Sequence, residues 1–411
     1  RIVFSNAAGE SLVLSDALVR NRALFENVEI VHMVAMGEAK YCEPGMEKHF
    51  RHNSFFLGAS TRKAAKEGRA DVTPVYFSEV TELFRTTLPV DAVFLNLSPP
   101  DEHGYCSFGI SVDYSKPAAM EAELVIAQIN PSMPRTLGDS FIHISDIDYI
   151  VEADTPLIEL PPAGISEVER AIGKNCASLI EDGDTLQLGI GAIPDAVLGF
   201  LKEKKDLGIH SEMISDGIVE LYEGGVITNR RKSLHAGKSI VTFLMGTRKL
   251  YDFADNNPAV ELHPVDYVND PYVIAQNERL VSVNSCVQVD LMGQIVSASV
   301  GRRQISGVGG QVDFVRGANM SRGGKSIMAM PSTAAEGRIS KIVPVIGEGA
   351  AVTTSRYDAD YIVTEYGAAR LKGESLRNRS KMLIRIAHPD FRRMLAEEYE
   401  KRFREAWSDD E

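Results

Sequence analysis

Short apolar runs of strand length alternate along the chain with stretches in which apolar residues recur every three to four positions. Residues 92–97 (Ala-Val-Phe-Leu-Asn-Leu) and 279–284 (Arg-Leu-Val-Ser-Val-Asn) are two such runs, and each predicts a strand. Strand patterns that alternate with helix patterns are typical of an α/β fold with a largely parallel sheet. We therefore expect open α/β architecture along the whole chain.

One segment has the composition of a linker between two domains. Residues 153–164 include three prolines, and Ser166 with Glu169 directly afterwards forms the pattern of a helix capping box. Apolar residues then recur at helical spacing up to Ile180, with Cys176 among them, and Gly183 is expected to end the helix. We predict a first domain over residues 1–160 and a second over 165–411, with Cys176 in the core.

Three segments of the first half recur in the second half in the same order. Residues 2–10 resemble 186–194, residues 29–34 resemble 208–213, and residues 96–104 resemble 284–293. Collinear matches indicate two duplicated α/β units, although common strand–turn–helix patterns also produce such matches by coincidence. The halves differ after their second strand, where the first has Val34 and the second has Glu212. If a carboxylate carries the chemistry, the second half supplies it and the first half forms the opposing wall of a cleft.

The two ends of the chain carry structural signals. The sequence begins with the strand-like run Arg1-Ile2-Val3-Phe4, without a methionine, so we expect a short N-terminal segment to be missing from the first domain. From Pro389 onwards, apolar residues four positions apart extend to Trp407 and predict a terminal helix that docks on the protein.

Composition excludes several classes of protein. Apolar residues make up 44% and charged residues 25%, which is ordinary for a globular protein and excludes dominant disorder. No apolar run reaches the length of a membrane-spanning helix. A net charge of −13 argues against general binding to nucleic acid or to an anionic membrane. The four cysteines are far apart and form no cluster with histidine, so we expect a reducing cytoplasm, no disulfide framework and no metal site.

Two glycine-rich segments are candidates for ligand contact. Residues 189–195 (Gly-Ile-Gly-Ala-Ile-Pro-Asp) follow a predicted strand and open a predicted helix, where exposed amides favour an anion or a polarised carbonyl oxygen. Pro194 replaces the third glycine of a dinucleotide-binding motif, so that function is excluded. Residues 306–311 (Ser-Gly-Val-Gly-Gly-Gln) are the second segment. A tight turn without ligand remains the alternative for the first segment, and a bulge or hairpin turn for the second.

Four glutamates are candidates for acid–base or nucleophilic chemistry: Glu212, Glu220, Glu261 and Glu365. Position favours Glu212, because it follows an apolar strand and precedes a turn, and ligands of parallel sheets bind beyond the carboxyl ends of strands. The motifs of serine hydrolases and zinc proteases are absent, and residues 319–326 fail the spacing of a phosphate-binding loop.

At these residues the chain resembles the acetyl-CoA hydrolase/transferase family, and within it the branch that transfers CoA to and from 4-hydroxybutyrate. The resemblance covers essentially the whole chain. It rests on six motifs: Gly-Ile-Gly-Ala-Ile-Pro-Asp-Ala-Val from Gly189, His-Ser-Glu-Met-Ile-Ser-Asp-Gly from His210, His-Pro-Val-Asp-Tyr-Val from His263, Gly-Val-Gly-Gly-Gln-Val-Asp-Phe from Gly307, Thr-Glu-Tyr-Gly from Thr364 and Ile-Ala-His-Pro-Asp-Phe from Ile386.

The resemblance implies a duplicated fold of the class I CoA-transferase type, with the active site in the cleft between two similar domains. It implies that Glu212 is the nucleophile and forms a glutamyl-CoA thioester. It also implies a homodimer or higher homo-oligomer, with CoA as substrate and no permanently bound cofactor. The residues that it implies as CoA contacts are Gly189, Ile190, Gly191, Ala192, Ile193, Val287 and Gly310.

The expected reaction moves CoA between a short-chain acyl-CoA, such as 4-hydroxybutyryl-CoA or butyryl-CoA, and a carboxylate such as acetate. Two alternatives remain at this point. An acetyl-CoA hydrolase would use the same site with water as acceptor. A regulator of the same fold would bind CoA or another ligand without catalysis.

Overall fold

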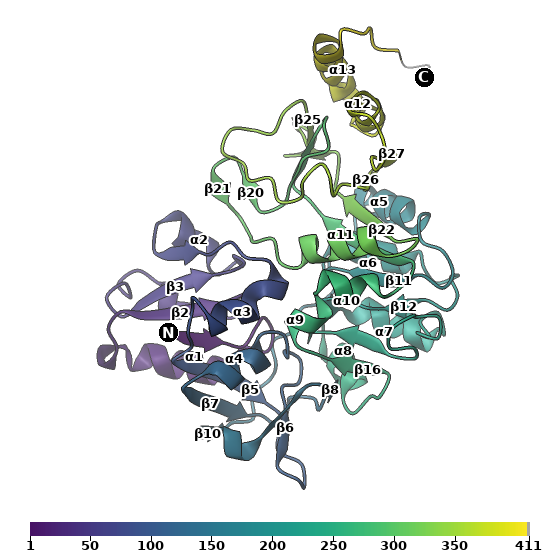
Figure 1. The fold of residues 1–411 in the computed structure, drawn as a ribbon. Coiled ribbons are helices and arrows are strands. Elements are labelled where there is room, and N and C mark those ends of the chain that lie inside the picture. Colours follow the sequence, from purple (N-terminus) through teal and green to yellow (C-terminus); the bar gives the residue numbers. More distant parts are fainter. Residues whose placement is uncertain (409–411) are drawn as a thin grey trace.

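The first half of the chain folds around a seven-stranded parallel sheet in the computed structural model, which describes residues 1–408 (Figure 1). The predicted strand at 92–97 is β5, an inner strand of this sheet, and it is buried along its whole length, as expected of a parallel strand covered on both faces. The strands run in the order β10 (Tyr149–Glu152), β7 (Leu124–Ile129), β5 (Ala92–Leu97), β1 (Ile2–Phe4), β2 (Val28–His32), β3 (Phe50–Ser54) and β4 (Ala70–Val72). The helices of this half are α1 (Leu12–Arg20), α2 (Arg62–Lys66), α3 (Val80–Arg85) and α4 (Ser115–Glu121).

The second half builds a similar sheet. The order is β12 (Gly208–Ile209), β11 (Thr185–Leu188), β17 (Leu280–Ser285), β22 (Lys325–Ala329), β26 (Tyr361–Thr364) and β27 (Gly367–Arg370), with β27 antiparallel to β26. A bridge between His210 and Ile240 links it to β14 (Ser239–Val241) and β16 (Val260–Leu262). Its helices are α5 (Glu167–Ala177), α6 (Ala192–Gly199), α7 (Asp216–Glu223), α8 (Arg248–Ala254), α9 (Val265–Val268), α10 (Pro271–Ala275) and α11 (Gln311–Met320).

The strand orders confirm that the two halves share one architecture. The order β10-β7-β5-β1-β2 in the first sheet corresponds to β26-β22-β17-β11-β12 in the second. The pairing of residues between neighbouring strands agrees with this correspondence. If Asn96 of the first half is aligned with Asn284 of the second, the residues paired across the strands align Ile2 with Thr185 and Ile30 with Gly208. Val34 of the first half then corresponds to Glu212 of the second, as the sequence predicts.

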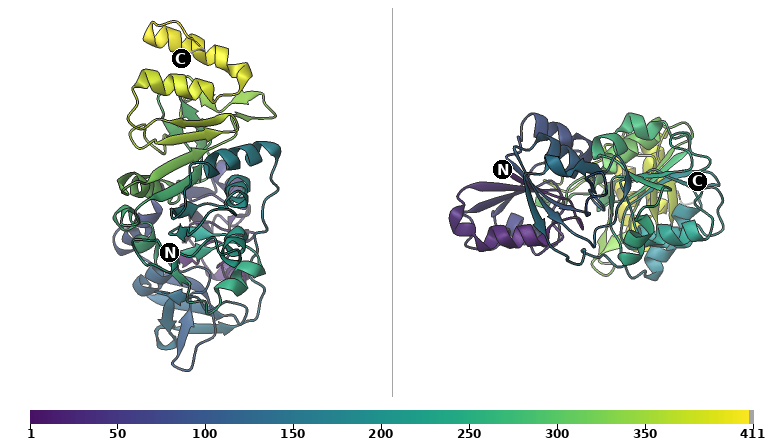
Figure 2. Two further views of the ribbon diagram at one scale, coloured as in Figure 1. Left: turned by 90° about the vertical axis from the view of Figure 1, so that its right-hand side faces the viewer. Right: turned by 90° about the horizontal axis from the view of Figure 1, so that it is seen from below.

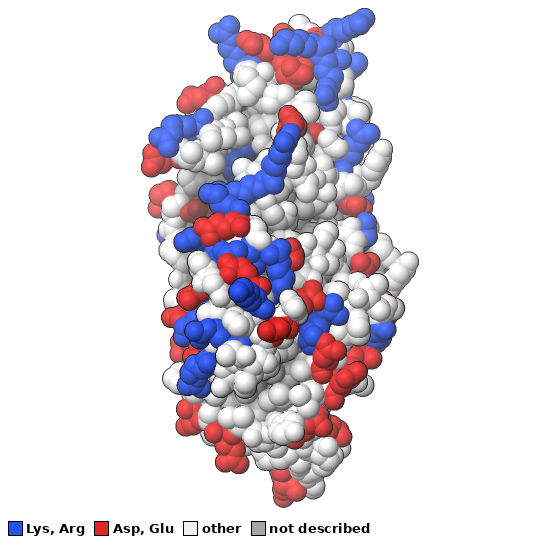
Figure 3. Space-filling model, turned by 90° about the vertical axis from the view of Figure 1, so that its left-hand side faces the viewer, with Lys and Arg blue, Asp and Glu red and all other residues white. Residues whose placement is uncertain are grey.

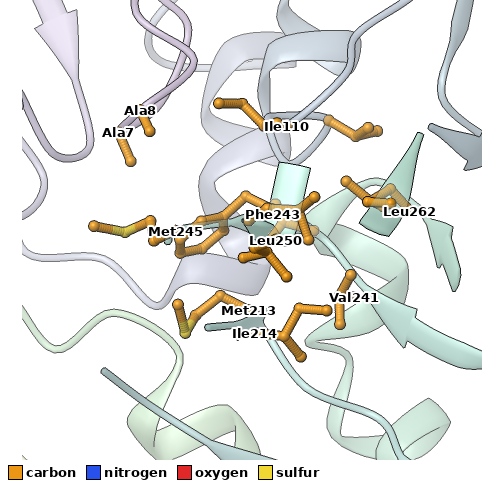
Figure 4. Packing of buried hydrophobic residues seen from close by; sticks show 14 of the residues in the cluster. Ala7, Ala8, Ile110, Met213, Ile214, Val241, Phe243, Met245, Leu250 and Leu262 are labelled. Atoms are coloured by element: carbon orange, nitrogen blue, oxygen red, sulfur yellow. The ribbon is translucent and has the colours of Figure 1, made fainter. Parts of the chain in front are cut away.

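The two halves pack against each other through a shared apolar core. Figure 4 shows Ala7, Ala8 and Ile110 of the first half beside Phe243 and Met245 of the second. The first half also adds strand β8 (Leu137–Gly138) to the edge of β16. Seen from below, the two sheets lie side by side (Figure 2). This packing fixes the position of β13 (Met213–Ile214), which directly follows Glu212, and of its partner strand β15 (Phe243–Leu244).

The linker and the helix after it agree with the prediction except at the helix end. Residues 153–166 contain no helix or strand, and Ser166 and Glu169 form the expected capping box at the start of α5. Cys176 is fully buried. The helix ends at Ala177, however, before Ile180 and Gly183, and Ile180 is buried beyond the helix. The family resemblance does not determine the boundary between residues 160 and 165, which stays a prediction.

The C-terminal helix pair lies at one end of the molecule (Figures 1 and 2). Helix α13 (Pro389–Phe403) begins where predicted and packs on α12 (Leu376–Arg385), with Leu395 and Tyr399 fully buried. The prediction that the helix includes Trp407 is wrong, because Arg404 adopts a left-handed conformation that ends it. The Trp407 ring instead packs edge-on against Tyr399. Among residues 1–408, no helix is long and apolar enough to cross a membrane.

Candidate active site

Glu212 lies beyond the carboxyl end of β12, between that strand and β13. Its backbone carbonyl accepts hydrogen bonds from the amides of Thr242 (3.0 Å) and Phe243 (3.2 Å). The preceding Ser211 is buried and donates through Oγ to the Met213 carbonyl at 2.7 Å. These bonds fix the backbone on both sides of Glu212, so its side chain starts from a rigid position.

The Glu212 carboxylate is half-buried and faces a cavity of about 200 Å³. Asn269 Nδ2 donates to Oε2 at 2.9 Å. Removal from bulk water raises the pKa of Glu212 to about 7, and the charges of Asp313 and Asp113 act in the same direction. The Asn269 amide and the Gly310 backbone amide oppose this increase, because they stabilise the charged carboxylate. The result is a carboxylate that is held in place and is more basic than an exposed glutamate.

Two buried aspartates near Glu212 were not predicted as part of the site. Asp313, in the first turn of α11, accepts hydrogen bonds from the Ser78 amide (3.1 Å) and the Ser78 hydroxyl (2.9 Å). Burial raises the pKa of Asp313 to about 7 and that of Asp113 to about 6. Three carboxyls in this region, those of Glu212, Asp313 and Asp113, therefore have pKa values above the ordinary range.

Gly310 approaches Glu212 so closely that no side chain fits there. A Cβ atom on Gly310 would lie 2.0 Å from Glu212 Oε2 and 2.2 Å from Asn269 Nδ2. The segment that contains Gly310 is neither a bulge nor a hairpin; it is the turn that enters α11, with Gly310 as the N-cap residue. Gly189 and Gly310 both line the Glu212 cavity, so the structure brings the two glycine-rich segments together.

The other predicted CoA contacts are distributed around this cavity. Ile190 and Gly191 line an adjacent cavity of about 270 Å³ under the linker. Gly191 has a φ of 107°, a conformation that favours glycine, and α6 begins directly after it, with Ala192 and Ile193 in its first turn. Val287 does not line the Glu212 cavity; it lies between β17 and β18 (Gln288–Asp290), and its amide donates to the Val296 carbonyl.

The first half supplies the opposing wall, as predicted. Phe56 lines the Glu212 cavity, and the Phe77 amide donates to the Gly309 carbonyl at 3.2 Å. Gly307 packs against the same segment, since a Cβ atom there would lie 2.1 Å from the Phe55 carbonyl oxygen. The site is therefore assembled across both halves, with the turn before α11 held between them.

The competing glutamates lie outside the Glu212 cavity. Glu220 is exposed near Lys202 and Lys249, Glu261 pairs with Lys238 and His263, and Glu365 accepts hydrogen bonds from Ser332. All four cysteines are free and buried. Among residues 1–408, no three His, Cys, Asp or Glu side chains gather as metal ligands would.

Sequence reasoning missed Asn269, Asp313 and Ser78. Asn269 directly follows the motif that begins at His263, and Asp313 lies inside the motif that begins at Gly307. An acidic residue between the apolar residues Val312 and Phe314, in the first turn of α11, was the available signal for Asp313. Ser78 gave no signal, because it joins the site only through the packing of the two halves.

Comparison with known proteins agrees with the motifs. Family models of the acetyl-CoA hydrolase/transferase N-terminal and C-terminal domains match residues 1–160 and 246–399. The chain is 64% identical to a 4-hydroxybutyrate coenzyme A transferase of Clostridium kluyveri, over 98% of this chain and 94% of that protein. It is 40% identical to a butyryl-CoA:acetate CoA-transferase of Anaerostipes caccae, over 94% of this chain and 90% of that protein.

A solved structure shows the same fold. The crystal structure of a 4-hydroxybutyrate CoA-transferase from Porphyromonas gingivalis matches with a TM-score of 0.85 at 46% identity, covering 98% of this chain and 93% of that one. Identity and coverage of this extent, together with the two family domains, lead to one conclusion. The chain belongs to the acetyl-CoA hydrolase/transferase family, and it is a CoA-transferase.

Proposed function

We propose that the chain transfers CoA between a short-chain acyl-CoA and a carboxylate such as acetate, with Glu212 as the nucleophile. The names of the relatives suggest 4-hydroxybutyryl-CoA or butyryl-CoA as donor. The observation that supports the role of Glu212 is its placement: a basic, half-buried carboxylate beside the Gly310 amide, facing a cavity formed by both halves.

The proposed cycle has two half-reactions that pass through covalent enzyme. A Glu212 oxygen attacks the thioester carbonyl, the C–S bond breaks, and CoA leaves as thiolate with the formation of an acyl-glutamyl anhydride. The thiolate then attacks the glutamyl carbonyl, which releases the acyl group as a carboxylate and leaves CoA bound to Glu212 as a thioester. A second carboxylate reverses these steps, so the kinetics are ping-pong.

The pKa of Glu212 makes the first attack less unfavourable. An ordinary glutamate, with a pKa of about 4.3, is about 4 units less basic than a thiolate with a pKa of about 8.5, a gap of roughly 6 kcal/mol. With the pKa of Glu212 raised to about 7, the gap falls to about 1.5 units, or roughly 2 kcal/mol. Backbone amides aimed at the developing oxyanion contribute further stabilisation. We propose the amide of Gly189, a residue that lines the cavity, as one such donor.

The Glu212 cavity is large enough for a short acyl group but not for the rest of acyl-CoA. At about 200 Å³, it is smaller than the roughly 300–1,000 Å³ of typical ligand sites. It therefore suits a short acyl chain, whereas the pantetheine and nucleotide parts extend outside it. We propose that Gly189 and Gly310, which line the cavity, contact CoA at its thioester end, and that the contacts outside the cavity are Ile190, Gly191, Ala192, Ile193 and Val287.

The charge of the surface is compatible with CoA phosphates despite the net charge of −13. Figure 3 shows Lys and Arg through the middle of the face of the first half, interspersed with Asp and Glu, whereas Asp and Glu predominate at its lower end. Local fields of this kind attract an anion even when the whole protein is acidic. We further propose a cytoplasmic homo-oligomer, a homodimer or larger, that uses CoA as substrate and holds no permanent cofactor.

Acetate dependence distinguishes a transferase from a hydrolase. We expect release of free CoA from butyryl-CoA to be slow without acetate, and acetyl-CoA to form rapidly once acetate is added, because the cavity lies between the two halves and limits access of water to the thioester. Thiol release and acetyl-CoA formation are measured side by side. Equal rates of CoA release with and without acetate would show a hydrolase.

Acidification should inactivate the enzyme near neutral pH. Glu212 attacks only when ionised, and its pKa is raised to about 7, so kcat/KM for the acyl-CoA should fall tenfold per pH unit below that value. Asp313→Asn should shift this midpoint to lower pH, because it removes a negative charge that raises the pKa of Glu212. A profile that stays flat down to pH 5 would contradict the assignment.

A further inference from the structure

Two amide side chains form one wall of the Glu212 cavity. Gln187 lies on β11 and Asn284 on the neighbouring strand β17, and both line the cavity. Gln187 Nε2 donates to Asn284 Oδ1 at 3.2 Å, and Asn284 Nδ2 donates to Gln187 Oε1 at 3.0 Å. A primary amide has two N–H donors and two acceptor positions, so each side chain has hydrogen-bonding capacity beyond this mutual pair.

The shape of the site indicates which part of the substrate reaches this wall. The reacting carbonyl must lie next to Glu212 and Gly310. The cavity is too small for CoA. The sulfur atom of the thioester and the rest of CoA therefore lie toward the opening of the cavity, and the acyl chain extends into it. Gln187 lies within β11, two residues before Gly189 along the chain, and is only 3% exposed, so it forms the deeper part of the cavity lining. The acyl chain then ends against the amide pair.

The remaining walls divide into an apolar and a polar part. Phe56, Leu188 and Met213 provide apolar surface around the cavity, which suits the methylene groups of an unbranched chain. The amide pair, which consists of buried Gln187 and partly buried Asn284, gains no hydrogen bond from a methyl group. It offers both a donor and an acceptor to a hydroxyl, which itself donates and accepts.

We infer that Gln187 and Asn284 recognise a hydroxyl group at the far end of the acyl chain, as in a 4-hydroxyacyl-CoA. This inference rests on the proposed function. The two amides satisfy one another when no hydroxyl is present, so an acyl chain without a hydroxyl is accepted as well. Without a hydroxyl, neither amide is left unpaired, so no penalty for an unpaired buried group arises. The preference in kcat/KM for an acyl chain with the hydroxyl is therefore that of one added hydrogen bond, roughly threefold to tenfold.

Three acyl-CoA donors test this inference in the full chain, with acetate as acceptor. These are 4-hydroxybutyryl-CoA, butyryl-CoA and pentanoyl-CoA, which carries a methyl group where the first carries its hydroxyl. In the wild type we expect the highest kcat/KM for 4-hydroxybutyryl-CoA and the lowest for pentanoyl-CoA. Equal use of pentanoyl-CoA and 4-hydroxybutyryl-CoA would overturn the inference without any variant.

The double variant Gln187→Met/Asn284→Leu removes both amides together, so neither is left buried without its partner. We expect the ratio of kcat/KM for 4-hydroxybutyryl-CoA to that for butyryl-CoA to fall threefold to tenfold. Ser282→Ala is the matched control, because Ser282 is paired with Gln187 in the β ladder and is buried outside the cavity lining. Its ratio should stay unchanged.

Intact mass separates failure of this inference from failure of the proposed function. If wild-type protein mixed with butyryl-CoA gains a CoA adduct on Glu212 but the double variant keeps the wild-type ratio, the amide pair does not recognise the hydroxyl. An equal loss of activity toward all three donors would overturn the inference in the same way. If the wild type forms no adduct at all, the proposed function itself is wrong.

Discussion

Replacing Glu212 by alanine should reduce CoA transfer by at least about a thousandfold, since the variant has no group that can form the covalent intermediate. The fold should remain intact, because the backbone bonds to Thr242 and Phe243 do not involve the Glu212 side chain. Steady-state transfer from butyryl-CoA to acetate measures the rate. Borohydride or hydroxylamine, added after mixing with acyl-CoA, releases CoA and converts a glutamyl thioester to an alcohol or a hydroxamate. The mass of the peptide that contains Glu212 then shows whether that residue carried the thioester.

Two further variants make this result specific. Glu212→Asp keeps the charge but shortens the side chain by one methylene, so it should also be severely impaired through misplacement of the attacking oxygen. Glu220→Ala removes an exposed glutamate outside the cavity and should keep wild-type activity. Activity above a few per cent in Glu212→Ala, or an adduct on another acidic residue, would eliminate Glu212 as nucleophile.

Burial of Glu212 also has a consequence for stability. Its pKa is higher in the folded protein than in the unfolded chain, so the folded state loses stability from this group as pH rises through about 7. Glu212→Gln should therefore unfold at a higher temperature than the wild type at pH 8, while it is inactive. Active sites commonly contain a residue that lowers stability but is required for turnover. A regulator that only binds a ligand would not require such a residue.

Much of the fold followed from local patterns. Residues 92–97 are a short, continuous apolar run, which is stable as a strand buried inside a sheet. Ser166 and Glu169 begin a helix because their side chains hydrogen-bond to each other's backbone amides within four residues. The duplication was predictable because each half repeats the same order of strand and turn signals. The ends of helices were less predictable: Arg404 stopped α13 in a left-handed conformation that no pattern in the sequence marks.

The site was predictable only in part, and the reason is distance along the chain. Glu212 and the two glycine segments stood out because each follows a strand or precedes a helix. Asn269 is 57 residues from Glu212 and meets it only through the packing of α9. The contact between Ser78 and Asp313 spans 235 residues and both halves. No local pattern contains such pairs, although each determines the charge and position of the proposed nucleophile.

Duplication explains why the site is asymmetric. Val34 occupies the position in the first half that Glu212 occupies in the second, so the second half alone carries the carboxylate at this position. The first half instead contributes Phe56 and the bonds that hold the turn before α11. One half thus supplies the proposed reactive group, and the other closes the cavity around it.

Gly310→Ala should reduce kcat by about a hundredfold, because the added methyl group displaces the Glu212 carboxylate by more than the tolerance of a reacting pair. The new Cβ would lie 2.0 Å from Glu212 Oε2 and 2.2 Å from Asn269 Nδ2, so both groups must move and their hydrogen bond at 2.9 Å is lost. Overpacking of this kind also costs about 1–3 kcal/mol of stability, which thermal unfolding measures separately from the rate.

The matched control for Gly310→Ala is Gly199→Ala at the end of α6, where an added Cβ meets no atom within 4 Å. It should leave kcat and stability near their wild-type values. The decisive comparison is that of Gly310→Ala with Glu212→Ala. Gly310→Ala retains the nucleophile, so it should still accumulate the CoA adduct on Glu212, only more slowly, whereas Glu212→Ala should form none. Normal turnover by Gly310→Ala would show that the close contact between this glycine and Glu212 does not position the reacting carboxylate.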